Sequence, residues 1–201
     1  MAILQVFNFI IQTKIFHETI SKMKNLTISR SLTLALSGML FSSMIWAQGD
    51  KSSRPSPPAT ATGKVNGATI TINYSSPSVK GRKIWGELVP YDQVWRAGAN
   101  EATLFTTDKD IKVEGKPLKA GKYSLYAIPG QNEWTIILNS QTGQWGIKMD
   151  GSTTEDPSKD VLRVKVKPQK AKAFQEHMAY TIDNNGFALV WENLSVPVMV
   201  K

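Results

Sequence analysis

Residues 59–75 read ATATGKVNGATITINYS, and this stretch decides the fold class. Asn66-Gly67 is a dipeptide preferred in two-residue type I′ turns, because both central positions of that turn need a positive φ. After the turn, apolar residues alternate with polar ones from Thr69 to Tyr74. Such alternation is typical of a strand that buries one face and leaves the other in water. The stretch therefore predicts a β-hairpin.

Further segments downstream also indicate strands, some by alternation and others by a high content of aromatic and β-branched residues. Strands are expected at ATLFTT (102–107), DIKVEG (110–115), GKYSLYAI (121–128), WTIILN (134–139), VLRVKVK (161–167), FALVWEN (187–193) and VPVMV (196–200). PGQNE (129–133) joins two of them as a second hairpin, and Pro197 suggests that the last strand lies at an edge. The alternating lysines of 161–167 are expected on the solvent face of a strand, rather than as a polyanion site.

Residues 174–183, FQEHMAYTID, could form a helix. We predict a strand, because Phe174, Met178, Tyr180 and Ile182 share one parity and lead into a turn. One helical turn is expected in WGELVPYDQVWR (85–96). About ten short strands with close turns predict an all-β fold, a single-domain antiparallel β-sandwich or jelly-roll-like fold with at most one short helix.

The first 47 residues differ from the rest of the chain. After Met23, two basic residues precede an uncharged, serine-rich run that ends at Ala47. This run is short for a membrane span and is typical of a signal peptide, so we expect cleavage near Ala47 or Gln48. The alternative is an uncleaved anchor from Met1. The predicted organisation is an N-terminal extension plus signal peptide (1–47), a Pro/Ser-rich arm (48–58) and an all-β domain (59–201).

Composition limits the classes of function. The chain has no cysteine, which excludes disulfides, thiolate metal sites and a cysteine nucleophile. The net charge is +8, and the leader holds four of the 24 basic and one of the 16 acidic residues, which leaves +5 after processing. We expect a periplasmic or extracellular protein that binds no nucleic acid and has no membrane span after cleavage. An anionic envelope polymer remains open as a partner.

Sequence templates for catalysis are missing. There is no Gly-x-Ser-x-Gly elbow, phosphate-binding loop or Gly-x-Gly-x-x-Gly fingerprint. His177 is the one histidine after the leader and falls on the polar side of a strand, so neither a Ser-His-Asp relay nor a histidine zinc site is predicted. Asp108 and Asp110 are expected in a turn rather than a calcium loop. We therefore expect no catalytic residue, no metal and no cofactor.

The connection KGRKIWGELVPYDQVWRAGANEAT (80–103) concentrates the unusual residues of the chain. Aromatic rings can stack on sugars, and forked arginine donors suit oxyanions or hydroxyls. Ligand sites are also common on long connections of a rigid scaffold. The candidate ligand-binding residues are Arg82, Trp85, Tyr91, Trp95, Arg96, Asn100 and Glu101.

Two other interpretations stay open. In the first, the indoles plug one end of a sandwich, Gly98 permits a tight turn, and Arg96 pairs with Glu101, which makes the segment a structural or interaction module. In the second, Glu101 is the acid or the nucleophile of a glycan hydrolase, with Asp92, Glu87 or Asp156 as the second carboxylate. A neighbouring guanidinium lowers the pKa of a carboxyl, which fits an ion pair better than a general acid.

Four quoted segments together resemble a known family: YSSPSVKGRKIWGELVPYDQVWRAGANEAT, LKAGKYSLYAIPGQNEWTIILN, QWG and KDVLRVKVKP. They are similar to an exported bacterial family catalogued as domain of unknown function 2911, from about Pro57 to Val200. Ser76 stands where members often have arginine. The resemblance implies a signal peptide and a compact all-β domain, and it implies no reaction. We therefore expect an exported protein that binds an envelope or extracellular glycan or anion without catalysis.

Overall fold

The computed structural model describes residues 51–201 as one compact unit, and the predicted signal peptide lies outside these residues. Ten strands make up the unit: β1 (Pro58–Val65), β2 (Ala68–Ser75), β3 (Thr103–Thr107), β4 (Ile111–Val113), β5 (Lys116–Leu118), β6 (Gly121–Ile128), β7 (Trp134–Asn139), β8 (Asp160–Val166), β9 (Gln169–Asp183) and β10 (Gly186–Met199). Within this part of the chain the helical pieces are two 3-10 turns, Lys51–Ser53 and Pro157–Lys159. The all-β prediction is confirmed.

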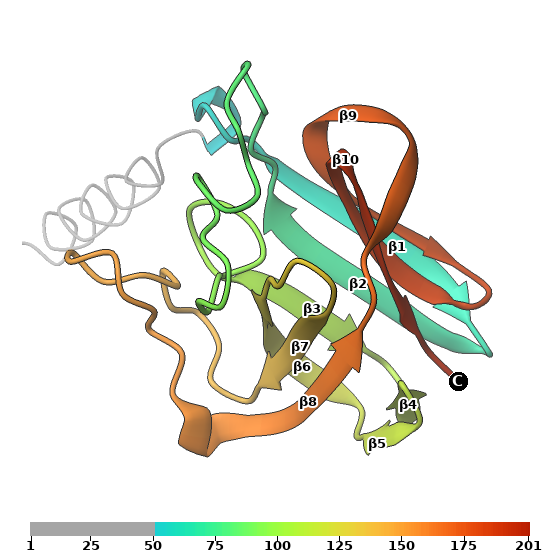
Figure 1. Cartoon of the computed structure of the whole chain (residues 1–201). Helices are drawn as coiled ribbons and strands as arrows, with labels where there is room; N and C mark the ends of the chain where they lie inside the picture. The colour runs from blue at the N-terminus through green and yellow to red at the C-terminus, as the bar shows by residue number, and fades with distance from the viewer. Residues whose placement is uncertain (1–50) are drawn as a thin grey trace, which may run out of the picture. The chain divides into compact units, whose positions relative to one another are not determined.

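Six strands form one antiparallel sheet in the order β1-β2-β3-β6-β7-β8. The small β4–β5 hairpin is inserted between β3 and β6, and the long β9–β10 hairpin forms a separate two-stranded sheet (Figure 1). None of the described helical segments has the length and apolar character needed to cross a bilayer.

The predicted Asn66-Gly67 hairpin is confirmed in detail. Asn66 has φ 49° and Gly67 has φ 82°, the positive values that the type I′ turn requires. Val65 pairs with Ala68 across the turn. Because the turn fixes the register, the apolar residues of β2 all face the core, and Ile70 and Ile72 are fully buried.

The β9–β10 hairpin closes the core over the six-stranded sheet. Its buried side chains, among them Met178, Trp191 and Val198, belong to the same apolar cluster as Phe105 and Leu138 of the large sheet. Burial of this shared apolar surface holds the two layers together.

Glycine allows β9 to approach β1 closely. A Cβ at Gly63 would lie 2.6 Å from Ile182 Cγ2, so a larger residue there would force the hairpin away. Figure 1 shows β9 beside β1.

Two expectations fail locally. The predicted helical turn at 85–96 is a set of hydrogen-bonded turns, in which Gly86 N donates to Val89 O and Val89 N donates to Ile84 O. Positive φ at Gly86 (85°) and Asp92 (60°) is incompatible with a right-handed helix.

Phe174 was expected on the buried face of a strand, and the strand prediction is confirmed, but the side chain is 55% exposed. Glu192 pairs with Gln175 and Leu194 with Lys170, so five steps of β9 span two steps of β10. Strict alternation is lost in such a bulge.

Strands β6 and β7 are buried on both faces. On the face away from the β9–β10 hairpin, Tyr126 and Asn139 are 0% exposed. The loop 140–159 covers this face, and Asn139 Nδ2 donates to Asp156 O at 2.8 Å. This loop also forms one wall of the candidate site.

Candidate functional site

The β2–β3 connection, residues 76–102, carries the candidate residues and is fixed at both ends by backbone pairing. Near its start, Val79 N donates to Glu176 O of β9 at 2.9 Å. Near its end, Trp95 and Ala127 of β6 exchange two hydrogen bonds of 2.8 Å each. The connection is therefore held like a strand at two points, and its side chains have defined positions.

Four tryptophans pack together where this connection crosses the core, and we call them the tryptophan cluster: Trp85, Trp95, Trp134 and Trp191. The Trp85 ring centroid lies 4.9 Å from Trp134, 5.7 Å from Trp191 and 6.0 Å from Trp95, always edge to face. Edge-to-face packing is favourable because ring edges are positive and ring faces negative. Trp85 is only 6% exposed and therefore belongs to the core.

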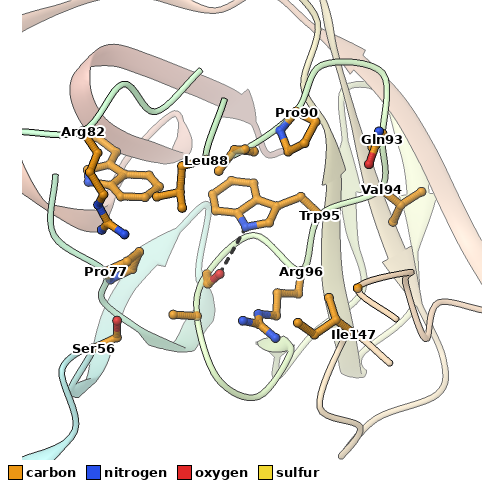
Figure 2. Close-up of a pocket in the computed structure, with 15 residues that line it drawn as sticks. Ser56, Pro77, Arg82, Leu88, Pro90, Gln93, Val94, Trp95, Arg96 and Ile147 are labelled. Atoms are coloured by element: carbon orange, nitrogen blue, oxygen red, sulfur yellow. Dashed lines mark hydrogen bonds between the residues drawn. The ribbon is translucent and has the colours of Figure 1, made fainter. Parts of the chain in front are cut away.

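Trp95 joins this cluster to an open pocket. Its ring stacks on Trp191 at 6.2 Å with an interplanar angle of 18°, and its Nε1 donates to Gly98 O at 3.2 Å. The ring is only partly buried and lines a cavity of about 430 Å³ (Figure 2). Small-molecule pockets usually enclose roughly 300–1,000 Å³. The cavity is therefore large enough for a small organic ligand.

Four separate segments build the pocket walls, one of which is β10 with Trp191. The β2–β3 connection contributes most of them, the loop 140–159 contributes Ile147 and Gly151, and the N-terminal arm contributes Ser56. Much of the lining is apolar: Pro77, Leu88, Val89, Pro90, Val94, Trp95, Ile147 and Trp191. The charged side chains of the lining are Arg82 and Arg96.

The two arginines differ in how much of their hydrogen-bonding capacity is used. Arg82 donates from Nε to Val79 O at 3.1 Å and from Nη2 to Ser78 O at 2.6 Å. Arg96 makes one long contact, from Nη1 to Trp145 O at 3.5 Å. Figure 2 shows both guanidinium groups pointing toward the middle of the pocket. Within residues 51–201, neither forms an ion pair with a carboxylate.

Burial lowers the pKa of Arg96, and the more distant charge of Glu101 opposes this effect. The aliphatic stem of Arg96 packs closely on Gly146 of the loop 140–159. A Cβ added at Gly146 would lie only 2.7 Å from Arg96 Cβ. Arg96 is therefore a positioned cation without a local counter-ion among the described residues.

The expected ion pair between Arg96 and Glu101 is wrong. Glu101 pairs with Arg54 at 3.0 Å and with Lys51 at 3.1 Å, both from the N-terminal arm. Neighbours in a turn need not face each other, and here the arm folds back to reach Glu101. Partial burial would raise the pKa of Glu101, but a backbone hydrogen bond and the two cations outweigh it and lower the pKa to about 2.

The other candidates also lie outside the pocket lining. Asn100 Nδ2 donates to Ser56 O at 2.9 Å and so holds the arm. The Tyr91 ring packs on Gly86, where a Cβ would be 2.8 Å from Tyr91 Cε2. Trp85 is in the core. Of the seven candidates, the structure brings Arg82, Trp95 and Arg96 to the pocket.

Gly98 has a role other than the one expected. Positive φ occurs at Ala97 (53°) and Asn100 (57°) rather than at Gly98. A Cβ at Gly98 would lie 2.7 Å from Thr103 Oγ1, so glycine is needed there for close packing. The Ala97 carbonyl accepts hydrogen bonds from Thr103 Oγ1 and Tyr180 Oη, which fix this part of the connection.

Sequence reasoning missed two polar contacts away from the pocket. Ser78 Oγ lies 2.9 Å from His177 Nδ1, although no carboxylate contacts that histidine among the described residues. Glu155 and Asp160 share Arg163, at 2.7 Å and 2.6 Å. The described residues contain no cluster of metal-binding side chains.

A comparison with protein families covers the region that holds this site. The family model described as "Protein of unknown function (DUF2911)" matches residues 56–200. The chain belongs to that family. The matched region includes every strand of the DUF2911 domain and the whole β2–β3 connection. No curated protein and no solved structure matches the chain significantly.

Proposed function

We propose that the DUF2911 domain is a non-catalytic module that binds a small glycan or anion in the pocket beside Trp95, outside the cytoplasm. The observation that carries the proposal is the partly exposed Trp95 ring in a cavity of about 430 Å³, which Arg96 also lines without a carboxylate partner among the described residues. An aromatic face and a positioned cation together are a common way to bind a polar organic ligand.

The charge state of Glu101 argues against a role as the general acid of a glycan hydrolase. A general acid must carry a proton at working pH, whereas a carboxyl with a pKa of about 2 is ionised under ordinary conditions. An ionised carboxylate suits a nucleophile, but the oxygens of Glu101 are bound by Lys51 and Arg54, and Glu101 lies outside the pocket lining. These contacts are those of a structural anchor for the N-terminal arm.

A matched pair of tryptophan variants tests the binding site. Trp95→Phe shrinks the ring that lines the pocket, and Trp145→Phe makes the same change at an indole that is 47% exposed and outside the lining. We expect ligands found by thermal-shift screening of neutral oligosaccharides and organic anions to bind Trp95→Phe several-fold more weakly. Trp145→Phe should bind them like the parent.

Calorimetric titration of both folded variants gives the comparison directly. Equal affinity of the parent and Trp95→Phe for every ligand found would contradict the proposed site. The export part of the proposal has its own test, which is N-terminal sequencing of the protein from a periplasmic or culture fraction. A mature chain that begins near Gln48 is expected, and a chain that retains the leader in the cytoplasm would contradict it.

A further inference from the structure

The polar side chains of the pocket lining are unbalanced in favour of donors. Arg82 and Arg96 carry guanidinium groups, which have five N–H donors each and no acceptor. Among the polar side chains of the lining, only Ser56 and Gln93 offer an acceptor oxygen, and there is no carboxylate. One nearby backbone acceptor is already used, because Gly98 O receives Trp95 Nε1.

This imbalance separates the two ligand classes. A sugar hydroxyl is both a donor and an acceptor, so a glycan in this pocket would leave hydroxyl donors without partners, at a cost in binding. Ionised oxyanions only accept hydrogen bonds and therefore match a donor-rich wall. Arg96 makes this match stronger, since it has no ion-pair partner among the described residues.

The apolar side of the pocket adds a second requirement. Leu88 is 44% exposed at the pocket, and Trp95, Val94 and Ile147 continue the apolar lining. A bare inorganic ion would leave this surface in contact with water. A ligand with an apolar body would cover it and gain affinity from the burial.

We propose that the ligand is an amphipathic organic anion, in which an oxyanion group binds Arg96 and an apolar body packs on Trp95. This inference rests on the proposed function. Arg82 stands across the pocket as a second donor. Neutral glycans should bind this site more weakly than such an anion, because few side-chain acceptors line it.

The experiment compares probes that differ only in the group under test. 2-Naphthoate and 2-naphthamide have the same apolar body, but only the first is an anion. Chitotetraose represents neutral glycans, and inorganic sulfate and phosphate represent the oxyanion alone. Each is titrated into the folded parent protein by calorimetry. We expect 2-naphthoate to bind at least about tenfold more tightly than 2-naphthamide, as for a charge-assisted hydrogen bond.

Arg96→Gln tests the assignment of the charge. It retains most of the stem that packs on Gly146 and removes the cation. Lys122→Gln makes the same change in charge at an exposed residue of β6 outside the pocket lining. We expect the preference for naphthoate over naphthamide to vanish in Arg96→Gln and to persist in Lys122→Gln. If Arg96→Gln does not fold, Arg96→Lys replaces it, with a weakened preference expected because the forked donor is lost.

The outcomes distinguish this inference from the proposed function. Equal binding of naphthoate and naphthamide, tighter binding of chitotetraose, or full affinity for inorganic sulfate or phosphate would overturn the amphipathic anion while leaving a ligand pocket in place. A preference for naphthoate that survives in Arg96→Gln would overturn the role of that residue. Failure of every probe to bind up to its solubility limit would overturn both proposals.

Discussion

Replacing Trp85 by alanine tests whether the tryptophan cluster holds the β2–β3 connection to the core. Trp85 is 6% exposed and contacts three other indoles at centroid distances of 4.9, 5.7 and 6.0 Å. Truncation of a buried large aromatic costs about 3–5 kcal/mol, because apolar contacts are lost and a cavity remains. Each edge-to-face contact contributes about 0.5–1.5 kcal/mol beyond the buried area.

One feature of Trp85 acts in the opposite direction. Its Nε1 is buried without a hydrogen-bond partner among the described residues, and an unmade hydrogen bond of this kind costs about 1–3 kcal/mol. Removing the indole also removes this penalty, so we expect Trp85→Ala to lose about 3–4 kcal/mol rather than the upper limit. Trp85→Phe removes the unpaired donor but keeps a ring, and should lose about 1–2 kcal/mol.

Urea unfolding followed by circular dichroism measures these free energies. Phe174→Ala serves as the control, because this ring is 55% exposed and surface changes usually alter stability by less than about 0.5 kcal/mol. For a domain of this size, a loss of 3–4 kcal/mol lowers the Tm by roughly 6–16 °C. A Trp85→Ala free energy of unfolding within about 1 kcal/mol of the parent would refute a core role for this residue.

Three further predictions concern packing and ionisation. Gly63→Ala should cost about 1–3 kcal/mol, because the new Cβ would lie 2.6 Å from Ile182 Cγ2, and Ile182→Ala should recover part of that loss in a double-mutant cycle. The lowered pKa of Glu101, about 2 against 4.5, stabilises the fold above pH 4.5, and this contribution is lost as the pH falls toward 2. Glu101 is 37% exposed, so solvent screening limits the effect to about 1 kcal/mol. Urea unfolding of Glu101→Gln should therefore differ from the parent at pH 6 and much less at pH 2. Burial and the neighbouring Asp160 raise the pKa of Glu155 and outweigh the opposite effect of Arg163. Ionising Glu155 is therefore less favourable in the folded protein, so the parent should lose stability as the pH rises above 4.5. Glu155→Gln should lose less over that range. A parent and Glu155→Gln with parallel stability profiles above that pH would contradict this assignment.

Local chemistry explains why the strands could be predicted. The Asn66-Gly67 turn needs only its own two φ angles, and the alternation in β2 and β8 reflects burial of one face. Phe174 shows the limit of this reasoning. Its parity agreed with that of Met178, but a bulge set by pairing with β10 exposes it, and the sequence of β9 alone carries no sign of that bulge.

The sequence predicted which segment carries the candidate site, but only some of the residues that line it. Aromatic and basic composition pointed to the β2–β3 connection, and three of its seven candidates line the pocket. Trp191 and Ile147 could not be assigned to the pocket from the sequence, because they come from β10 and the loop 140–159. The partners of Glu101 were missed for the same reason, since Arg54 is 47 residues away along the chain.

The amino-acid sequence by itself determined the antiparallel all-β class, most strand positions and membership of a family, because turn dihedrals and alternating burial are properties of adjacent residues. Only the tertiary structure decided that Trp85 is core while Trp95 lines a pocket. It also decided that Glu101 anchors the arm, and that Arg96 has no carboxylate partner within residues 51–201. Those outcomes depend on which distant strands and loops meet. These long-range contacts are fixed by packing of the whole core, and no short segment of sequence specifies them.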